Sequence, residues 1–156
     1  MSFTDDKDSD NYATDKKGWE IIEPYIPKDK KIWAPFYCDG KQKEYFEEMG
    51  YDIIHQDKDF FSYTPEYDII IDNPPFSKIK DISIKLKELD KPFILILPVS
   101  TITKQFVKVL ERDKIQMIIP SKRMQFEKAG VELSRCYFDC CYLCYKMELE
   151  HDITFI

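Results

Sequence analysis

The chain lacks a long apolar run and an excess of basic charge. Its longest apolar stretch, Phe93 to Val99, is far too short to cross a bilayer, and Met1 to Lys17 has no apolar segment of the kind found in signal peptides. The net charge is −6 and the pI is near 5.0. We therefore expect an intracellular, cytoplasmic protein without membrane contact. The net negative charge also argues against broad electrostatic binding to free duplex DNA.

Cysteine is present in an odd number and is clustered. Cys38 stands alone, and the other four lie between Cys136 and Cys144. A strand would place Cys136, Cys140 and Cys144 in a row that is too extended to close around one zinc ion. We therefore expect buried thiols in a reducing compartment, with neither a metal site nor disulfides.

The 156 residues, 44% of them apolar, suit one compact domain. We expect a flexible tail over residues 1–16 and a single domain over residues 17–156. Strands are predicted at residues 31–37, 51–55, 60–61, 67–71, 92–99, 115–119 and 135–147. Helices are predicted at residues 19–25, 42–49, 79–89 and 105–112. This order predicts a doubly wound α/β sheet that is closed by an antiparallel pair.

The segment from Tyr67 to Ser77 carries the strongest functional signal. Its β-branched isoleucines are typical of a strand buried on both faces, and Pro74 ends that strand because proline cannot donate to a ladder. Two consecutive prolines fix the backbone, so the Asn73 amide is aimed with little entropy left to lose. The Asn73 and Pro74 oxygens could accept from an exocyclic NH2 group while Phe76 stacks on the ring that carries it.

The tetrapeptide Asn73-Pro74-Pro75-Phe76 resembles the signature of the amino-methyltransferases that use S-adenosylmethionine, which is Asn or Asp, two prolines, then Tyr, Phe or Trp. The resemblance extends over residues 12–147. It implies a Rossmann-like sheet of the class I methyltransferase type, mostly parallel, with the last strand antiparallel and inserted between two others. It also implies S-adenosyl-L-methionine as cofactor and residues 73–76 as the catalytic group. The implied substrate is N6 of adenine, in a flipped-out or single-stranded base of DNA or RNA.

The loop that would face the cofactor departs from the family pattern. The family has an acidic residue at the position of Ala34 and a glycine at that of Cys38. A side chain at Cys38 is expected only with a negative φ or with the loop moved outward. The resemblance implies cofactor contacts from this loop, with Asp39 replacing the lost charge; the residues concerned are Pro35, Phe36, Tyr37, Asp39 and Gly40.

Further site residues follow from the resemblance. Asp57 would accept from the ribose hydroxyls, Asp59 and Phe60 would hold the cofactor adenine, and Thr14 would touch the cofactor carboxylate. Basic residues on the same edge of the sheet are expected to contact the nucleic acid, namely Lys78, Lys122 and Arg123. Because we expect no further domain that could recognise a nucleic-acid sequence, we expect this recognition to come from the loop at residues 121–134, a partner subunit or a homo-oligomer.

Two other functions remain open at this point. A catalytically inactive methyltransferase-like scaffold or nucleic-acid-binding subunit would explain Ala34 and Cys38. A protein glutamine methyltransferase is the other alternative. It is disfavoured by Phe76, where that branch has Tyr, and by the absence of an additional substrate-binding domain.

Overall fold

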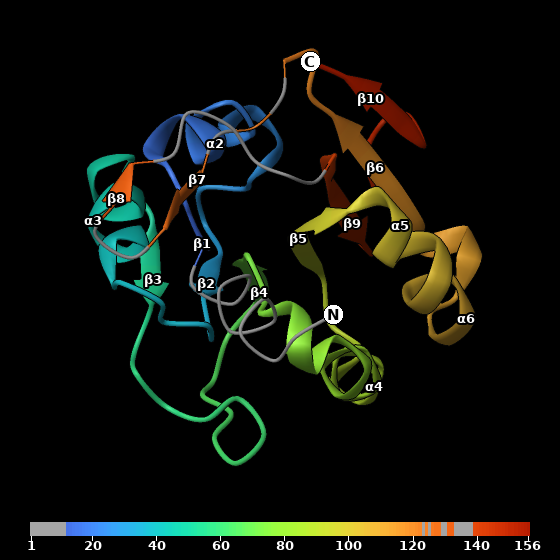
Figure 1. Ribbon diagram of the computed structural model, residues 1–156, viewed down its shortest axis with the longest axis horizontal. Coiled ribbons are helices and arrows are strands. Elements are labelled where there is room, and N and C mark those ends of the chain that lie inside the picture. Colours follow the sequence, from blue (N-terminus) through green and yellow to red (C-terminus); the bar gives the residue numbers. More distant parts are fainter. Residues whose placement is uncertain (1–11, 123, 125, 129–130, 133–138) are drawn as a thin grey trace.

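A seven-stranded sheet forms the centre of the computed structural model, which describes residues 12–122, 124, 126–128, 131–132 and 139–156. The strand order is β10-β6-β9-β5-β4-β2-β3 (Figure 1). The strands are β2 (Lys31–Trp33), β3 (Asp52–Ile54), β4 (Ile69–Asp72), β5 (Phe93–Pro98), β6 (Ile115–Ile119), β9 (Cys140–Tyr145) and β10 (Ile153–Phe155). Strand β9 lies antiparallel between β5 and β6, and every other pairing in this sheet is parallel. The predicted fold class, an α/β sheet of the class I methyltransferase type, is confirmed.

Helices cover both faces of the sheet, which makes three layers (Figure 1). One face carries α2 (Lys16–Glu20), the short η1 (Glu23–Tyr25) and α3 (Lys41–Glu48). The other carries α4 (Ile79–Leu89) and a helical segment made of α5 (Val99–Thr101), the π-helical η3 (Ile102–Phe106) and α6 (Val107–Val109). The one-turn helices η2 (Phe76–Lys78) and η4 (Arg112–Lys114) precede α4 and β6.

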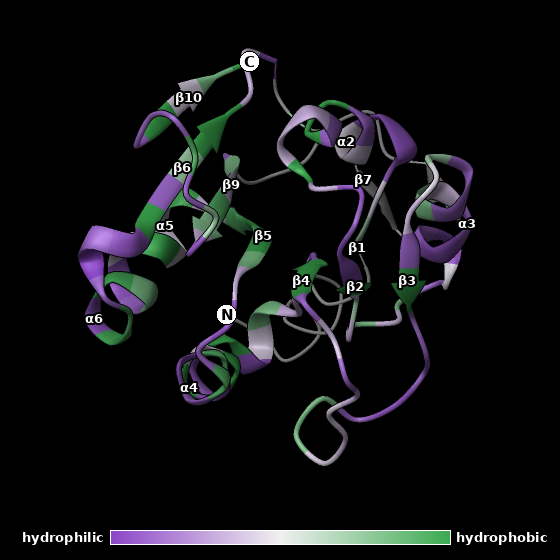
Figure 2. Ribbon diagram, turned by 180° about the vertical axis from the view of Figure 1, so that it is seen from behind, coloured by the Kyte–Doolittle hydropathy of each residue, from purple (hydrophilic) through white to green (hydrophobic). Residues whose placement is uncertain are grey.

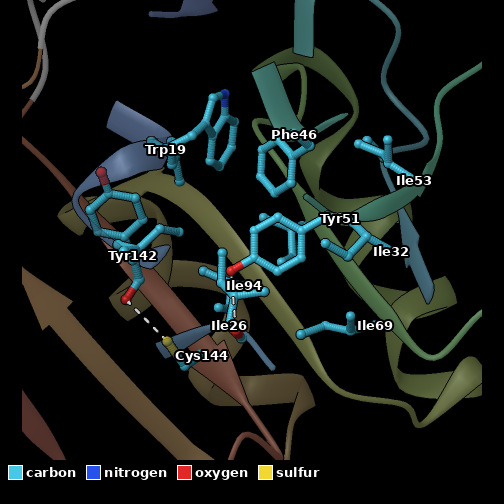
Figure 3. Close-up of a cluster of buried hydrophobic side chains, with 14 of the residues drawn as sticks. Trp19, Ile26, Ile32, Phe46, Tyr51, Ile53, Ile69, Ile94, Tyr142 and Cys144 are labelled. Carbon is cyan, nitrogen blue, oxygen red and sulfur yellow. Dashed lines mark hydrogen bonds between the residues drawn. The ribbon is translucent and has the colours of Figure 1, made fainter. Parts of the chain in front are cut away.

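The core is divided by the sheet into two parts because successive side chains of a strand point to opposite faces. Ile69 and Ile71 of β4 pack with Trp19 and Phe46 on the α2 and α3 side (Figure 3), whereas Ile70 packs on the α4 side. All four residues of β4 and all six of β5 are buried. Figure 2 shows both strands as hydrophobic and α3 as largely hydrophilic. Each large apolar side chain buried in this way contributes about 1.5–3 kcal/mol to stability.

Several elements differ from the sequence prediction. The helix predicted at residues 19–25 is divided into α2 and η1, and the strand predicted at residues 31–37 ends at Trp33. A strand was predicted at residues 60–61, but these residues lie in a turn, and the described segment between β3 and β4 contains no strand. The helical segment predicted at residues 105–112 begins directly after β5 and ends at Val109. Strand β10 was not predicted; it adds a parallel edge next to β6, after the antiparallel strand.

A second, small sheet joins the N-terminal end of the described chain to two short strands that follow β6 in the sequence. It consists of β1 (Tyr12–Thr14), β7 (Phe126–Lys128) and β8 (Val131–Glu132). Strand β1 is antiparallel to β7, with Thr14 opposite Phe126. Residues 12–14 were expected in a flexible tail, but they form this strand. Helix α2 then begins at Lys16, where the Asp15 side chain accepts a hydrogen bond from the Gly18 amide at 2.9 Å.

The described cysteines of β9 are part of the core. Cys141 and Cys144 are buried on opposite faces of the sheet, and Cys140 is half-buried. Cys136 lies outside the described residues. Within the described part of the chain, no helix has the length and apolar character needed to cross a membrane.

Candidate active site

Asn73 follows directly on β4, at the carboxyl edge of the parallel strands where ligands bind in open α/β sheets. Its Nδ2 donates to the Thr14 hydroxyl of β1 at 3.2 Å. Thr14 reaches this position because α2 packs closely against β1. A Cβ on Gly18 would lie 2.6 Å from the Thr14 methyl group, so a glycine is needed in α2. The small sheet therefore delivers Thr14 to the end of β4.

The Asp72 carboxyl ties the end of β4 to the loop after β2. One oxygen, Oδ2, accepts from the Phe36 amide at 2.6 Å, and the other, Oδ1, accepts from the Asn73 amide at 2.7 Å. Asp72 is 2% exposed. Burial raises the pKa of this carboxyl well above its usual value, and the two backbone hydrogen bonds oppose that shift. Asp72 thus fixes two loops with one side chain.

The loop after β2 turns through two residues with positive φ. Cys38 has φ 51° and Gly40 has φ 78°. A negative φ at Cys38 had been one of the two expected accommodations, and it is not the one the loop adopts. Burial raises the pKa of the Cys38 thiol to about 11. At Gly40 a Cβ would lie 2.6 Å from the Tyr37 hydroxyl, so Tyr37 folds over a position that only glycine fits.

His55 packs against this loop, a role that no pattern in the sequence indicates. It follows β3, and its ring stacks on Tyr37 with centroids 5.0 Å apart. Its Nδ1 lies 2.8 Å from the Ala34 carbonyl, which accepts. The other ring nitrogen, Nε2, is buried and has no hydrogen-bond partner in the described chain. Burial lowers the pKa of His55, so the neutral ring is favoured.

A cavity of about 250 Å³ opens between three loops, those after β2, β3 and β4. Apolar and aromatic side chains line it together with one carboxylate and two lysines. The lining residues are Pro35, Phe36, Tyr37, Cys38, Lys58, Asp59, Phe60, Phe61, Asn73, Pro75, Lys78 and Ile82. Ligand pockets in proteins start at about 300 Å³, so the volume of this cavity lies just below that range.

A second cavity of about 20 Å³ adjoins the first, because Asn73 and residues 36–38 line both. The lining is completed by Ala13, Thr14, Trp19, Asp39, Gln42 and Asp72. Gln42, at the start of α3, is held by a hydrogen bond from its Nε2 to the Ile71 carbonyl at 2.8 Å. The space suits one water-sized polar group.

The structure gathers most of the predicted site residues around these two cavities. The predicted residues that line the larger cavity are Pro35, Phe36, Tyr37, Asp59, Phe60, Asn73, Pro75 and Lys78. Thr14 and Asp39 line only the smaller cavity. Three residues lie nearby without lining either cavity: Gly40, the buried Pro74 and the half-buried Phe76. Asp57 and Lys122 are exposed and line neither cavity, and Arg123 lies outside the described residues.

Phe60 was predicted to pack against the cofactor adenine, but in the structure Phe60 and Phe61 differ in burial, and Phe60 is the more buried of the two. Phe60 is 4% exposed and packs against Trp33 and Phe36, so most of its surface belongs to the core. Phe61 is 39% exposed and also lines the larger cavity. Its backbone amide donates to Asp59 at 3.2 Å. The ring available to a ligand is therefore mainly that of Phe61. An adjacent Phe-Phe pair in the sequence does not show which member is buried.

Comparison with known proteins gives distant similarities of shape. No protein-family model matches the sequence, and no curated protein matches it. Among solved structures, precorrin-6y C5,15-methyltransferase from Geobacter metallireducens GS-15 is 13% identical, with 88% of this chain and 93% of that chain covered and a TM-score of 0.44. A methyltransferase from Pyrococcus furiosus is 12% identical, with 83% and 81% covered and a TM-score of 0.41. At such similarity the strand order of the sheet itself carries the fold class.

Proposed function

We propose that this chain is an S-adenosylmethionine-dependent methyltransferase that acts on the exocyclic amine of a nucleobase, with N6 of adenine in DNA or RNA as the first candidate. One observation carries the proposal. Asn73 lies at the carboxyl end of β4 and lines both cavities together with the loop after β2. The amine clamp and the expected cofactor loop therefore face the same space. Had Asn73 been packed away from that loop, no transfer between them would be possible.

The residues present suit the proposed cofactor. Phe36 and Phe61 offer aromatic surface in the larger cavity, and Asp59 offers a carboxylate that can accept from an amine on a ring. The smaller cavity has polar side chains in its wall and admits a group of the size of the ammonium at the amino-acid end. S-adenosylmethionine, when bound, supplies an electrophilic methyl group. Asp57 was expected at the ribose, but it lines neither cavity, so it has no support from the geometry.

The chain's own contribution is to hold the accepting amine. The Asn73 Oδ1 and the Pro74 carbonyl are the groups that can accept its two N–H bonds, which keeps the nitrogen lone pair available and stabilises the positive charge that develops. Pro74 and Pro75 restrict the backbone that carries these acceptors. Alignment of this kind accounts for most of the catalysis that a direct transfer needs.

The substrate side is supported by charge near the larger cavity. Lys58 and Lys78 line it, and both are exposed, so they can contact phosphates next to a flipped-out or single-stranded base. The loop at residues 121–134 also borders the site, because its strand β7 pairs with β1, which carries Thr14. Lys122 at the start of this loop is exposed. With the net charge of −6, a partner subunit or a second copy would have to supply further contacts.

The inactive-scaffold hypothesis keeps specific support. Ala34 has no side-chain carboxylate to offer a cofactor. It is also fully buried, and its carbonyl accepts a hydrogen bond from His55. Calorimetric titration with S-adenosylmethionine separates the two functions. The proposed enzyme gives saturable heat, whereas the absence of heat at high ligand concentration would favour the scaffold.

The activity itself is tested by incubating the protein with isotopically labelled S-adenosylmethionine and DNA or RNA, single-stranded and duplex. Nucleosides are then measured by mass spectrometry. We expect label on adenine N6, with more product from single-stranded substrate, because no base has to be unpaired. Label on cytosine would show that the substrate base is cytosine rather than adenine, while the proposed type of reaction would still hold. Binding of the cofactor with no labelled nucleoside in any pool would exclude a nucleic-acid substrate.

A further inference from the structure

Asp72 is a buried carboxyl with unused acceptor capacity. A carboxylate offers about four acceptor sites. Two are taken by the Phe36 and Asn73 amides. Asp72 also lines the smaller cavity while remaining 2% exposed. A group that enters this cavity therefore meets an acceptor that is already held in place on both oxygens.

No cation of the described chain neutralises this carboxyl. None of the ion pairs in the described residues includes Asp72, and the only groups that favour its ionised form are the two backbone amides. Buried carboxylates are normally paired with a cation or else kept protonated, because an isolated charge is costly to bury. Because Asp72 forms part of the wall of the smaller cavity, a cation that enters this cavity could pair with its carboxyl.

The other lining groups of the smaller cavity suit a compact cation with several N–H bonds. Thr14 contributes a hydroxyl, Gln42 a side-chain amide and Asp39 a second carboxylate. The volume of about 20 Å³ admits one group of the size of water or ammonium. The larger cavity, with its aromatic lining, continues directly from this point.

We propose that Asp72 binds the α-ammonium group of the cofactor and so takes the place of the acidic residue that this chain lacks at Ala34. The assignment rests on the proposed function, because it needs a ligand with an amino-acid end. It goes beyond the earlier expectation that Asp39 replaces the lost charge. Asp39 is exposed, and its Oδ1 accepts from the Lys41 amide at 3.1 Å, so solvent screens its charge more than that of Asp72.

Two neutral thioethers test the assignment with the full chain. S-adenosylhomocysteine carries the ammonium group, and 5′-methylthioadenosine has the same nucleoside without the amino-acid end. We expect Asp72→Asn to reduce the affinity for S-adenosylhomocysteine by about 10- to 100-fold, the usual range for hydrogen bonds to a charged group. The affinity for 5′-methylthioadenosine should change by less than about 2-fold. Asp39→Asn, the matched variant of the second carboxylate, should give a smaller selective loss.

The possible failures are distinguishable. If Asp72 serves only to hold the two loops, Asp72→Asn reduces the affinity for both thioethers equally, which overturns the assignment. A larger selective loss in Asp39→Asn returns the role to that residue. A wild-type chain that binds neither thioether overturns the proposed function and the assignment together.

A measurement on the wild-type chain covers the case in which Asp72→Asn does not fold. Burial raises the pKa of Asp72, so a cation that pairs with it displaces a proton. Calorimetry in two buffers of different ionisation enthalpy counts that proton. Near pH 5 the ligand's α-amino group, with an ordinary pKa of about 8, stays charged. We expect proton release with S-adenosylhomocysteine and none with 5′-methylthioadenosine. Tyr37, Cys38 and Asp39 are the other titratable residues that line this cavity, and equal release with both ligands would contradict the proposal.

Discussion

The loops after β4 and β2 meet at one edge of the sheet, yet they obtain their shapes in different ways. The loop after β4 is fixed locally, because Pro74 and Pro75 restrict the backbone next to Asn73. The loop after β2 has no such local restraint, and it is held from outside by the Asp72 carboxyl and the His55 ring. Tertiary contacts can therefore set the shape of a loop whose local sequence does not.

The largest effect is expected from the locally fixed loop. Asn73→Ala should reduce methyl transfer by at least about 100-fold, as removal of one positioned polar group does in other enzymes. The midpoint of thermal unfolding should stay nearly unchanged, since Asn73 is only partly buried. Single-turnover rates with labelled cofactor measure the loss. Asn73→Asp keeps the acceptor oxygens and should retain part of the activity. Full activity in Asn73→Ala would remove the proposed role.

The loop after β2 is best tested at Gly40. Gly40→Ala places a Cβ against Tyr37 at a positive φ, so we expect a loss of about 1–2 kcal/mol in the free energy of unfolding and weaker binding of S-adenosylhomocysteine. Gly50→Ala is the matched control, because Gly50 also has a positive φ but no atom within 4 Å of its added Cβ. Urea unfolding of both variants isolates the Tyr37 contact. Equal losses in stability and affinity would show that this contact contributes nothing.

The contribution of His55 is expected to depend on pH. Its pKa in the folded chain is lowered below the ordinary 6.5, so the unfolded chain binds more protons in the interval between the two values. Stability from the neutral ring is present above pH 6.5 and is lost as the pH falls below it, by at most about 1.4 kcal/mol per pH unit. Urea unfolding from pH 7.5 to 5 should show a shallower decline in His55→Gln. His151→Gln, at an exposed position, should follow the wild type.

The smallest effect is expected at Cys38. Cys38→Gly removes the cost of a positive φ, while it increases the entropy of the unfolded chain. We expect a net gain of about 0.5–1 kcal/mol in the free energy of unfolding. Urea unfolding measures it. A loss of stability would show that the Cys38 side chain holds the loop, and the contrast between the two loops would then be weaker.

The sequence predicted the parts of the fold whose causes are local. The isoleucine run and the two prolines placed β4 and its loop, and the apolar residues at helical spacing gave α4 the bounds that it has in the structure. Other features depend on contacts between distant residues. The pairing of β1 with β7, the hydrogen bond from the Phe36 amide to Asp72 and the stacking of His55 on Tyr37 leave no periodic pattern in the sequence. Asp57 is exposed and lines neither cavity, and a carboxylate after a strand is equally common in a solvent-exposed turn, so the sequence alone does not distinguish the two roles.

The pairing of β1 with β7 has a consequence for how the protein is made. Thr14 lies opposite Phe126, so the threonine that contacts Asn73 is translated early, whereas its partner strand leaves the ribosome late. Contacts so far apart in the sequence form slowly, because a long loop has to close first. The nascent chain can complete β4 and its diproline turn well before this pairing exists. The pairing that holds Thr14 beside Asn73 therefore forms only after β7 has been synthesised.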